Sequence, residues 1–188
     1  MRLGQKFFNQ PTIDLAKALL GKYLVVGDLR GKIVETEAYL GKNDPGCHAS
    51  RGLTPRNAPM FGPAGYTYVY FIYGMYYCLN VVSGKTGVGE AVLIRALEPI
   101  DGIEVMQKRR KTTKIENLCS GPGKLTQAFG ITKEHNNLSL LTGELQIHNS
   151  REKPEIEISK RVGLSVAQDL ELRFFIKGNR FVSKGPKG

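Results

Sequence analysis

The stretch YTYVYFIYGMYYCLN, residues 66–80, decides the fold of this 188-residue chain, because it joins dense aromatic residues to a single turn signal. It holds six of the eight tyrosines, a clustering that even spacing would not give. Aromatic and β-branched residues favour strands, so residues 66–72 and 76–83 are predicted strands. Tyr73-Gly74-Met75 predicts a tight turn between them. With a third predicted strand at residues 90–96, the centre of the chain is strongly β.

A second hairpin is predicted upstream of this centre. Residues 22–26 and 32–39 flank the turn-favouring segment 27–31. Side chains alternate along a strand, so the two faces of residues 32–39 carry different sets: Ile33, Glu35, Glu37 and Tyr39 on one, and Val34, Thr36 and Ala38 on the other. Two carboxylates therefore share a face with a tyrosine.

The remaining elements are shorter. Residues 11–20 predict a helix capped by Thr12, and a helix after Pro99 runs through Met106 to the basic residues 108–111, where cations suit a helix C-terminus. Residues 120–125 form a glycine-rich start to another helix, whose free N–H groups could receive a phosphate. Three short strands and a loose tail are predicted at 145–149, 155–159, 173–176 and 183–188.

The charge of the chain favours a polyanionic partner. Lysines and arginines number 27 against 17 acidic residues, a net charge of +10. Many small basic proteins bind nothing acidic, so the charge needs a matching site.

No apolar run could cross a bilayer and no secretory signal is present, which predicts a soluble cytoplasmic protein without a membrane partner. Cys47, Cys78 and Cys119 lack metal or disulfide spacing and predict free thiols.

Tyr73 and Glu37 are the two positions where this pattern suggests chemistry. An exposed ring on a hairpin turn is costly unless it enters something such as a DNA base stack; the alternative is a packed corner. A strand carboxylate beside aromatic rings can be desolvated into a general base, although most strand glutamates face solvent. His48 lies in the long loop 41–65, where a packing role is the common one. The dispersed histidines predict no metal site.

Several motifs together resemble the alkyladenine (3-methyladenine) DNA glycosylase family, the mammalian-type purine DNA glycosylases in their bacterial-type form. They occur in order along nearly the whole chain: VETEAYLG at 34–41, His48, TPRN at 54–57, YVYFIYGMYYCLN at 68–80 and LIRALEP at 93–99. Weaker matches are GPGKL at 121–125, RVG at 161–163 and RFFIKGN at 173–179. The resemblance implies a mixed α/β (α+β) single domain over residues 1–188. Its mostly antiparallel curved sheet would carry flanking helices and a protruding hairpin.

The resemblance also implies residue roles. Glu37 would be the catalytic base that activates water, and Arg95 would help to hold that water or a nearby phosphate. Tyr73 would intercalate into DNA. The pocket for a flipped purine would be formed by Tyr39, Gly46, His48, Tyr70 and Asn80, with Asn80 crowding the exocyclic amine of normal guanine.

The implied activity is that of a monofunctional glycosylase without cofactor or metal. It would flip 3-methyladenine, 7-methylguanine or hypoxanthine out of double-stranded DNA and hydrolyse the N-glycosidic bond, starting base excision repair. It would act as a monomer near the bacterial nucleoid. Two alternatives stay open from the residues: a non-catalytic nucleic-acid binder that uses the same tyrosines, and a hydrolase of RNA or nucleosides.

Overall fold

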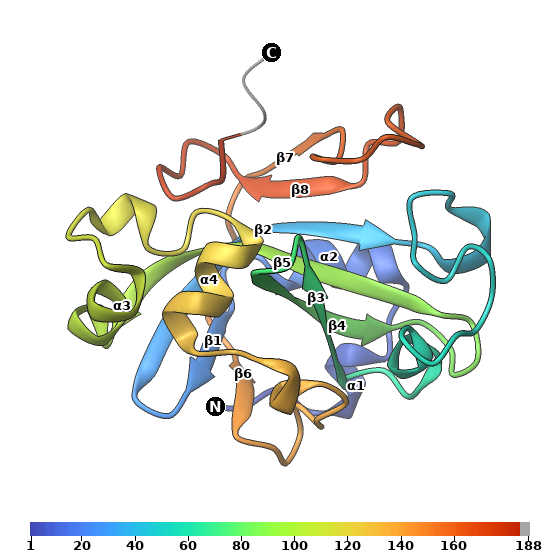
Figure 1. Cartoon of the computed structure of the whole chain (residues 1–188), viewed down its shortest axis with the longest axis horizontal. Coiled ribbons are helices and arrows are strands. Elements are labelled where there is room, and N and C mark those ends of the chain that lie inside the picture. Colours follow the sequence, from blue (N-terminus) through green and yellow to red (C-terminus); the bar gives the residue numbers. More distant parts are fainter. Residues whose placement is uncertain (185–188) are drawn as a thin grey trace.

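One curled antiparallel sheet organises residues 1–184, the part of the chain that the computed structural model describes (Figure 1). Its order is β3-β4-β5-β2-β1-β6, and β8 pairs with both β2 and β7. The strands are β1 (Tyr23–Val26), β2 (Leu29–Tyr39), β3 (Thr67–Ile72), β4 (Tyr76–Ser83), β5 (Glu90–Asp101), β6 (Leu145–His148), β7 (Ile156–Ser159) and β8 (Arg173–Ile176). The predicted mixed α/β class with a mostly antiparallel curved sheet is confirmed.

Short helices pack on this sheet and complete the core. α2 lies against β2 and β5, and α4 lies against β4 and β5. Leu15 and Leu19 of α2 and Leu125 and Phe129 of α4 are fully or almost fully buried in the main apolar cluster. The α-helices are α1 (Gln5–Phe8), α2 (Thr12–Leu19), α3 (Ile103–Arg110) and α4 (Pro122–Phe129). The 3-10 helices are η1 (Gly41–Asn43), η2 (Ala58–Phe61), η3 (Ile115–Asn117) and η4 (Lys133–His135).

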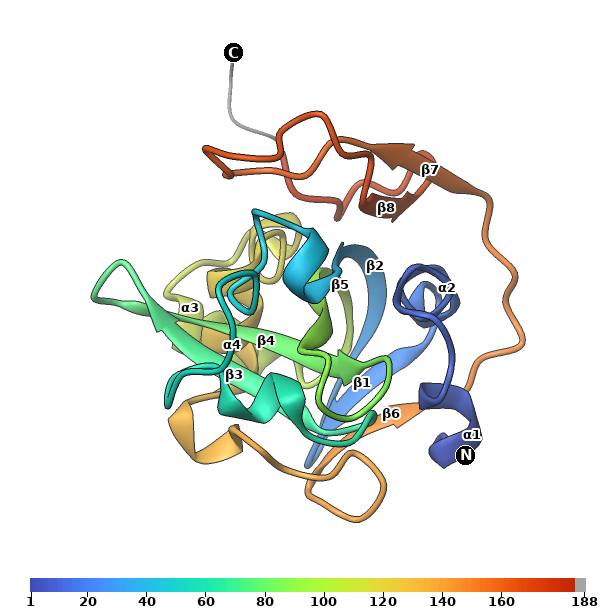
Figure 2. The ribbon, with the colours of Figure 1, turned by 90° about the vertical axis from the view of Figure 1, so that its right-hand side faces the viewer.

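The β3–β4 hairpin projects from the body of the molecule (Figure 2). Its turn has Tyr73 at φ 53° and Gly74 at φ 66°. Glycine adopts this left-handed region without steric cost, whereas a tyrosine there is strained. The hairpin and its turn at residues 73–75 confirm the prediction for the aromatic stretch.

A β-bulge in β2 corrects the predicted division of its two faces. The register against β5 shifts between Ile33 and Glu35 and again before Thr36. Ile33 therefore joins Ala38 in the main core, and Val34 packs in a separate cluster with Ala96 and Phe181. A bulge adds one residue to one strand and so reverses the alternation beyond it. The predicted placement of Ile33 beside Glu35, Glu37 and Tyr39 is wrong for this reason.

Several predicted boundaries also move. β2 begins at Leu29, so only Gly27-Asp28 separates it from β1. β5 continues through Pro99, which pairs with Gly31. Pro11, and not Thr12, precedes α2, and the Thr12 hydroxyl instead lies 2.9 Å from Ser83 Oγ. Cooperative pairing in the sheet extends strands past local turn signals.

The predicted loose tail is wrong at its first residue. Ser183 is buried, and its backbone N–H donates a hydrogen bond to Glu35 at 2.7 Å. Residues 185–188 of that prediction lie outside the described part of the chain.

The three cysteines, Cys47, Cys78 and Cys119, are buried free thiols, as predicted. Within residues 1–184, each helix is too short or too polar to span a bilayer.

Candidate active site

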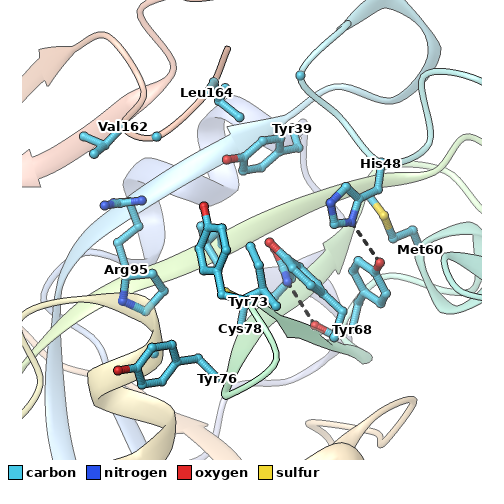
Figure 3. A pocket seen from close by; sticks show the side chains of 18 residues that line it. Tyr39, His48, Met60, Tyr68, Tyr73, Tyr76, Cys78, Arg95, Val162 and Leu164 are labelled. Atoms are coloured by element: carbon cyan, nitrogen blue, oxygen red, sulfur yellow. Dashed lines mark hydrogen bonds between the residues drawn. The ribbon is translucent and has the colours of Figure 1, made fainter. Parts of the chain in front are cut away.

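A cavity of about 420 Å³ opens where the hairpin, β2, β5 and the segment 162–164 meet (Figure 3). Aromatic rings and a few polar groups form its walls. Among the predicted site residues, the lining includes Tyr39, Gly46, His48, Tyr70, Tyr73, Asn80 and Arg95. The fold thus brings together side chains from several strands, a hairpin turn and a loop.

Glu37 lies directly behind this lining. Its side chain is fully buried, and the cavity wall does not include it. Oε1 accepts a hydrogen bond from the Val162 N–H at 2.8 Å and lies 3.5 Å from Arg95 Nη1. Oε2 accepts one from the Tyr39 hydroxyl at 2.9 Å. All three partners line the cavity, so the carboxyl group is one layer from its interior.

The surroundings of Glu37 work against its ionised form. Burial raises its pKa, and the positive charge of Arg95 and the hydrogen bonds from Val162 and Tyr39 oppose that effect only in part. A carboxyl group with a raised pKa suits proton transfer near neutral pH better than an ordinary glutamate does.

Arg95 is a buried and firmly held cation. Its Nε donates to Glu35 Oε1 at 2.9 Å, and Nη2 lies 3.4 Å from Ser183 Oγ. These bonds orient Nη1 toward Glu37. The guanidinium therefore presents one edge to the candidate base and uses the rest on fixed partners.

Two tyrosines and a histidine form the aromatic wall. The His48 and Tyr70 ring centroids are 4.5 Å apart, and those of Tyr68 and Tyr70 are 5.2 Å apart. His48 Nδ1 lies 3.0 Å from the Tyr68 hydroxyl. Burial, with help from the charge of Arg56, lowers the pKa of His48. A neutral imidazole and flat rings suit contact with a planar heterocycle.

Asn80 and Gly46 shape the cavity. Asn80 is buried, and its Nδ2 donates to the Tyr68 carbonyl at 3.0 Å, which fixes the direction of the amide. A Cβ at Gly46 would lie 2.9 Å from Arg161 Nη2 and 3.0 Å from Leu164 Cδ1. Glycine is needed there because the two segments approach so closely.

Tyr73 stands at the rim of the cavity with 79% of its surface exposed. The packed-corner alternative is therefore wrong. The turn conformation also explains why Tyr70 and Tyr73 reach the same cavity, since strand alternation does not extend into a turn.

Sequence reasoning missed the support of this site. Arg161 and Asp44 form a fully buried bidentate pair, with Nη2 2.7 Å from Oδ1. The Arg161 guanidinium also lies 4.7 Å from the Tyr39 ring centroid. The motif at 161–163 drew attention to the segment that contains Arg161. No local pattern, however, indicates that Arg161 pairs with Asp44, 117 positions away.

Comparisons with known proteins place the chain in one family. Residues 6–180 match the family model described as Methylpurine-DNA glycosylase. A protein of Methanoculleus marisnigri named for 3-methyladenine DNA glycosylase is 50% identical, covering 98% of this chain and 100% of that protein. A Francisella tularensis protein of the same name is 53% identical, covering 92% and 94%. One from Chlorobaculum tepidum is 49% identical, covering 100% and 93%.

Proposed function

Because this chain belongs to the methylpurine-DNA glycosylase family, we propose that it excises damaged purines from duplex DNA with water activated by Glu37. The chain is a DNA glycosylase of the 3-methyladenine type, a hydrolase of N-glycosyl bonds that serves DNA repair. The finer proposal concerns its mechanism, its range of lesions and its site residues.

The observation that carries the mechanism is the position of Glu37. The three groups that hold its carboxyl group, from Tyr39, Arg95 and Val162, all line one ring-walled cavity. The carboxyl group is fully buried behind these groups, so the attacking water reaches it where one of these partners moves aside. Arg95 Nη1 and the Val162 N–H keep the carboxylate oriented while it accepts a proton.

The proposed reaction exchanges one bond for another. Water loses a proton to Glu37, its oxygen forms a bond to C1′ of the deoxyribose, and the N-glycosidic electron pair leaves with the purine. Positive charge develops on the sugar as that bond breaks, and the nearby carboxylate stabilises it. No lysine is assigned as a nucleophile, so we expect base release without strand cleavage.

The range of lesions follows from the leaving group. Alkylation at N3 or N7 makes the purine cationic, so 3-methyladenine and 7-methylguanine leave without further protonation. Hypoxanthine is neutral and needs a proton as well. Tyr39, His48 and Tyr70 offer ring faces and edges to a flipped purine. The fixed amide of Asn80 would crowd the exocyclic amine of guanine and so disfavour the undamaged base.

The exposed hairpin tip supports duplex DNA as the substrate. Tyr73 is exposed at the tip of a projecting hairpin and at the rim of the cavity. A side chain there can fill the space that an everted nucleotide leaves in the base stack. Damage weakens stacking or pairing and lowers the cost of flipping by part of its usual few kcal/mol.

The decisive experiment replaces the candidate base. Glu37→Gln should bind a hypoxanthine or 7-methylguanine duplex about as well as the parent protein, because the shape of the side chain is kept. The amide oxygen can still accept from Val162, and the amide nitrogen can donate to the Tyr39 hydroxyl. Single-turnover release of the base should fall at least ~1,000-fold, since the amide cannot accept the proton. Glu157→Gln, at an exposed position in β7, is the matched control and should behave like the parent.

Three outcomes would contradict the proposal. Undiminished release by Glu37→Gln removes the assigned base. A DNA adduct trapped by borohydride shows imine chemistry in place of hydrolysis. Faster cleavage of RNA or free nucleosides than of lesion-containing duplex DNA favours the other hydrolase class.

A further inference from the structure

A second carboxylate lies behind Arg95, opposite the cavity. Glu35 is fully buried, and its Oε1 accepts hydrogen bonds from Arg95 Nε at 2.9 Å and from Arg173 Nε at 2.7 Å. Glu35, Glu37, Arg95 and Arg173 thus form a balanced group of two negative and two positive charges. Buried charges of this kind need complete hydrogen bonding to be tolerated.

Ser183 completes that hydrogen bonding from the far end of the chain. Its N–H donates to Glu35 Oε2 at 2.7 Å and its hydroxyl to Glu35 Oε1 at 2.8 Å. The same hydroxyl lies 3.4 Å from Arg95 Nη2, and the Ser183 carbonyl accepts from Arg173 Nη2 at 3.2 Å. Phe181 anchors the segment by packing against Val34 and Ala96. Ser183 lies beyond residue 180, where the family match ends.

We infer that Ser183 is a positioning residue for excision: by holding Glu35 and Arg95 in one arrangement, it keeps Arg95 Nη1 directed at Glu37. This inference rests on the proposed function, because it gives Glu37 the role of base. Ser183 itself is not among the residues that line the cavity and acts only through Glu35 and Arg95. The pairing of β2 with β5 fixes the backbone positions of Glu35 and Arg95. Ser183 then fixes how the Arg95 guanidinium is rotated about its hydrogen bond to Glu35.

The donors of the Arg95 guanidinium are divided among three neighbouring residues. Arg95 has three nitrogens, and each has one partner: Glu35, Glu37 and Ser183. Without the Ser183 hydroxyl, Nη2 loses its acceptor and Glu35 Oε1 loses a donor. The guanidinium is then free to turn further onto Glu35, and Glu37 loses part of the positive charge that favours its ionised form.

Other groups also face Glu37 and must be kept constant. They are Glu35 and Tyr39 on β2, Tyr70 on β3, Cys78 on β4, Arg95 on β5, and Arg161 with the Val162 N–H in the loop after β7. A substitution at Ser183 leaves the chemical identity of every one of these groups unchanged.

The test compares Ser183→Ala with Ser183→Thr. Ser183→Ala should slow single-turnover base release at neutral pH about tenfold, the effect of removing one hydrogen bond to a charged group. The acidic limb of its pH–rate profile should move ~0.5–1 pH unit higher. Ser183→Thr keeps the hydroxyl and should restore both the rate and the position of the limb. Affinity for the lesion duplex should stay unchanged in both variants.

Two further variants separate positioning from mere stability. Ser159→Ala removes the acceptor of Arg173 Nη1, 3.0 Å away, but no partner of Arg95; it should leave the pH profile unmoved. Glu35→Gln removes negative charge beside Arg95 and, if it folds, should shift the limb to lower pH, opposite to Ser183→Ala.

The inference is overturned if Ser183→Ala keeps the parent pH profile, or if Ser183→Thr fails to restore it in a folded protein. Loss of thermal stability without movement of the limb would also overturn it. These results are distinguishable from failure of the proposed function, which is tested with Glu37→Gln, borohydride trapping and RNA or nucleoside substrates, and not with variants of Ser183.

Discussion

At the scale of single residues, the site depends on a carboxyl group whose ionised form is opposed by burial. Burial raises the pKa of Glu37. Arg95, Val162 and Tyr39 each oppose this rise by stabilising the ionised form. A base must be ionised before it can accept a proton, so activity is present above this pKa and lost as the pH falls through it. The balance of burial against three donors thus sets the working pH range.

The pH dependence of excision provides a direct check. Release of 7-methylguanine should decline in acid with a midpoint above the ordinary glutamate value of 4.5. Tyr39→Phe removes the donor to Oε2, so it should raise the pKa of Glu37 further and move the midpoint to higher pH. Single-turnover rates measured from about pH 5 to 8 test this.

Tyr23→Phe, on β1 and outside the cavity lining, is the matched control. A midpoint that Tyr39→Phe does not move would assign the acidic limb to another group, with His48 the first candidate because its pKa is lowered from 6.5.

At the scale of elements, the tip of the β3–β4 hairpin holds Tyr73 in a strained backbone conformation, although its exposed side chain gains little stability from packing. Tyr73 combines a positive φ with 79% exposure. Strained residues that persist without stabilising contacts are typical of functional sites. The hairpin is long enough to project, and β4 anchors it through its pairing with β5.

Tyr73→Ser should therefore weaken binding to lesion duplexes far more than it affects the fold. Loss of one stacking ring should reduce affinity about tenfold or more, whereas stability should change by no more than ~0.5 kcal/mol. Fluorescence anisotropy and thermal unfolding measure the two effects. Val105→Ser, at an exposed apolar position of α3, should change neither. Equal affinity of Tyr73→Ser and the parent would refute the wedge.

The C-terminal end of α3 is the second part of the molecule that we expect to bind DNA. Lys108, Lys111 and Lys114 line one surface groove. Nearby, the pKa of Lys124 is lowered by burial and by the positive charges of Arg110 and Lys184, so cations crowd the start of α4. Gly123 of α4 lines the cavity itself. A DNA backbone that crosses the cavity mouth would therefore pass close to these positively charged side chains.

The double variant Lys111→Gln/Lys114→Gln should bind duplex DNA with a shallower salt dependence. For each lysine that neutralises a phosphate in the parent protein, the slope of log affinity against log salt should become shallower by ~0.9. Lys6→Gln/Lys153→Gln is the control, because α1 and the segment before β7 lie away from the hairpin tip (Figure 2). An unchanged slope for the first pair would show that the α3 end is only a solvated helix terminus.

At the scale of the whole molecule, the C-terminal third returns to close the site that the N-terminal half builds. The Arg161–Asp44 pair joins the loop after β7 to the loop after β2, and Arg161 also donates to the Ala38 carbonyl at 3.0 Å. These bonds place Val162 against Glu37 and Arg161 over Tyr39. One buried ion pair therefore fixes one wall of the cavity.

Asp44→Asn should destabilise the protein by about 3–5 kcal/mol, because it leaves a buried guanidinium without its counter-charge. Calorimetry should show Tm falling by ~2–4 °C for each kcal/mol. Arg161 lowers the pKa of Asp44 despite burial. The pair's contribution is thus present above the ordinary value of 3.8 and is lost as the pH falls through the lowered pKa, where parent and variant should converge.

Asp169→Asn breaks an exposed pair with Lys160 at 3.2 Å and is the control. It should cost no more than about 1 kcal/mol. Similar losses in the two variants would show that the buried pair does not fix the wall.

The sequence by itself determined the local part of this protein: the aromatic hairpin, the strand with Glu37 beside Tyr39, the basic end of α3 and the motifs of a glycosylase family. Propensity, alternation and turn chemistry act over a few residues, and a sequence displays them directly. Glu37 and Tyr39 share a face for that reason, and the hydrogen bond between them follows from it.

Only the tertiary structure decided what surrounds those elements. The bulge that moves Ile33 into the main core arises from pairing with β5. The bonds of Arg161 to Asp44 and of Ser183 to Glu35 join residues 117 and 148 positions apart. Such contacts depend on how the whole chain packs, and a buried charge finds its partner through three-dimensional packing, which no local pattern encodes.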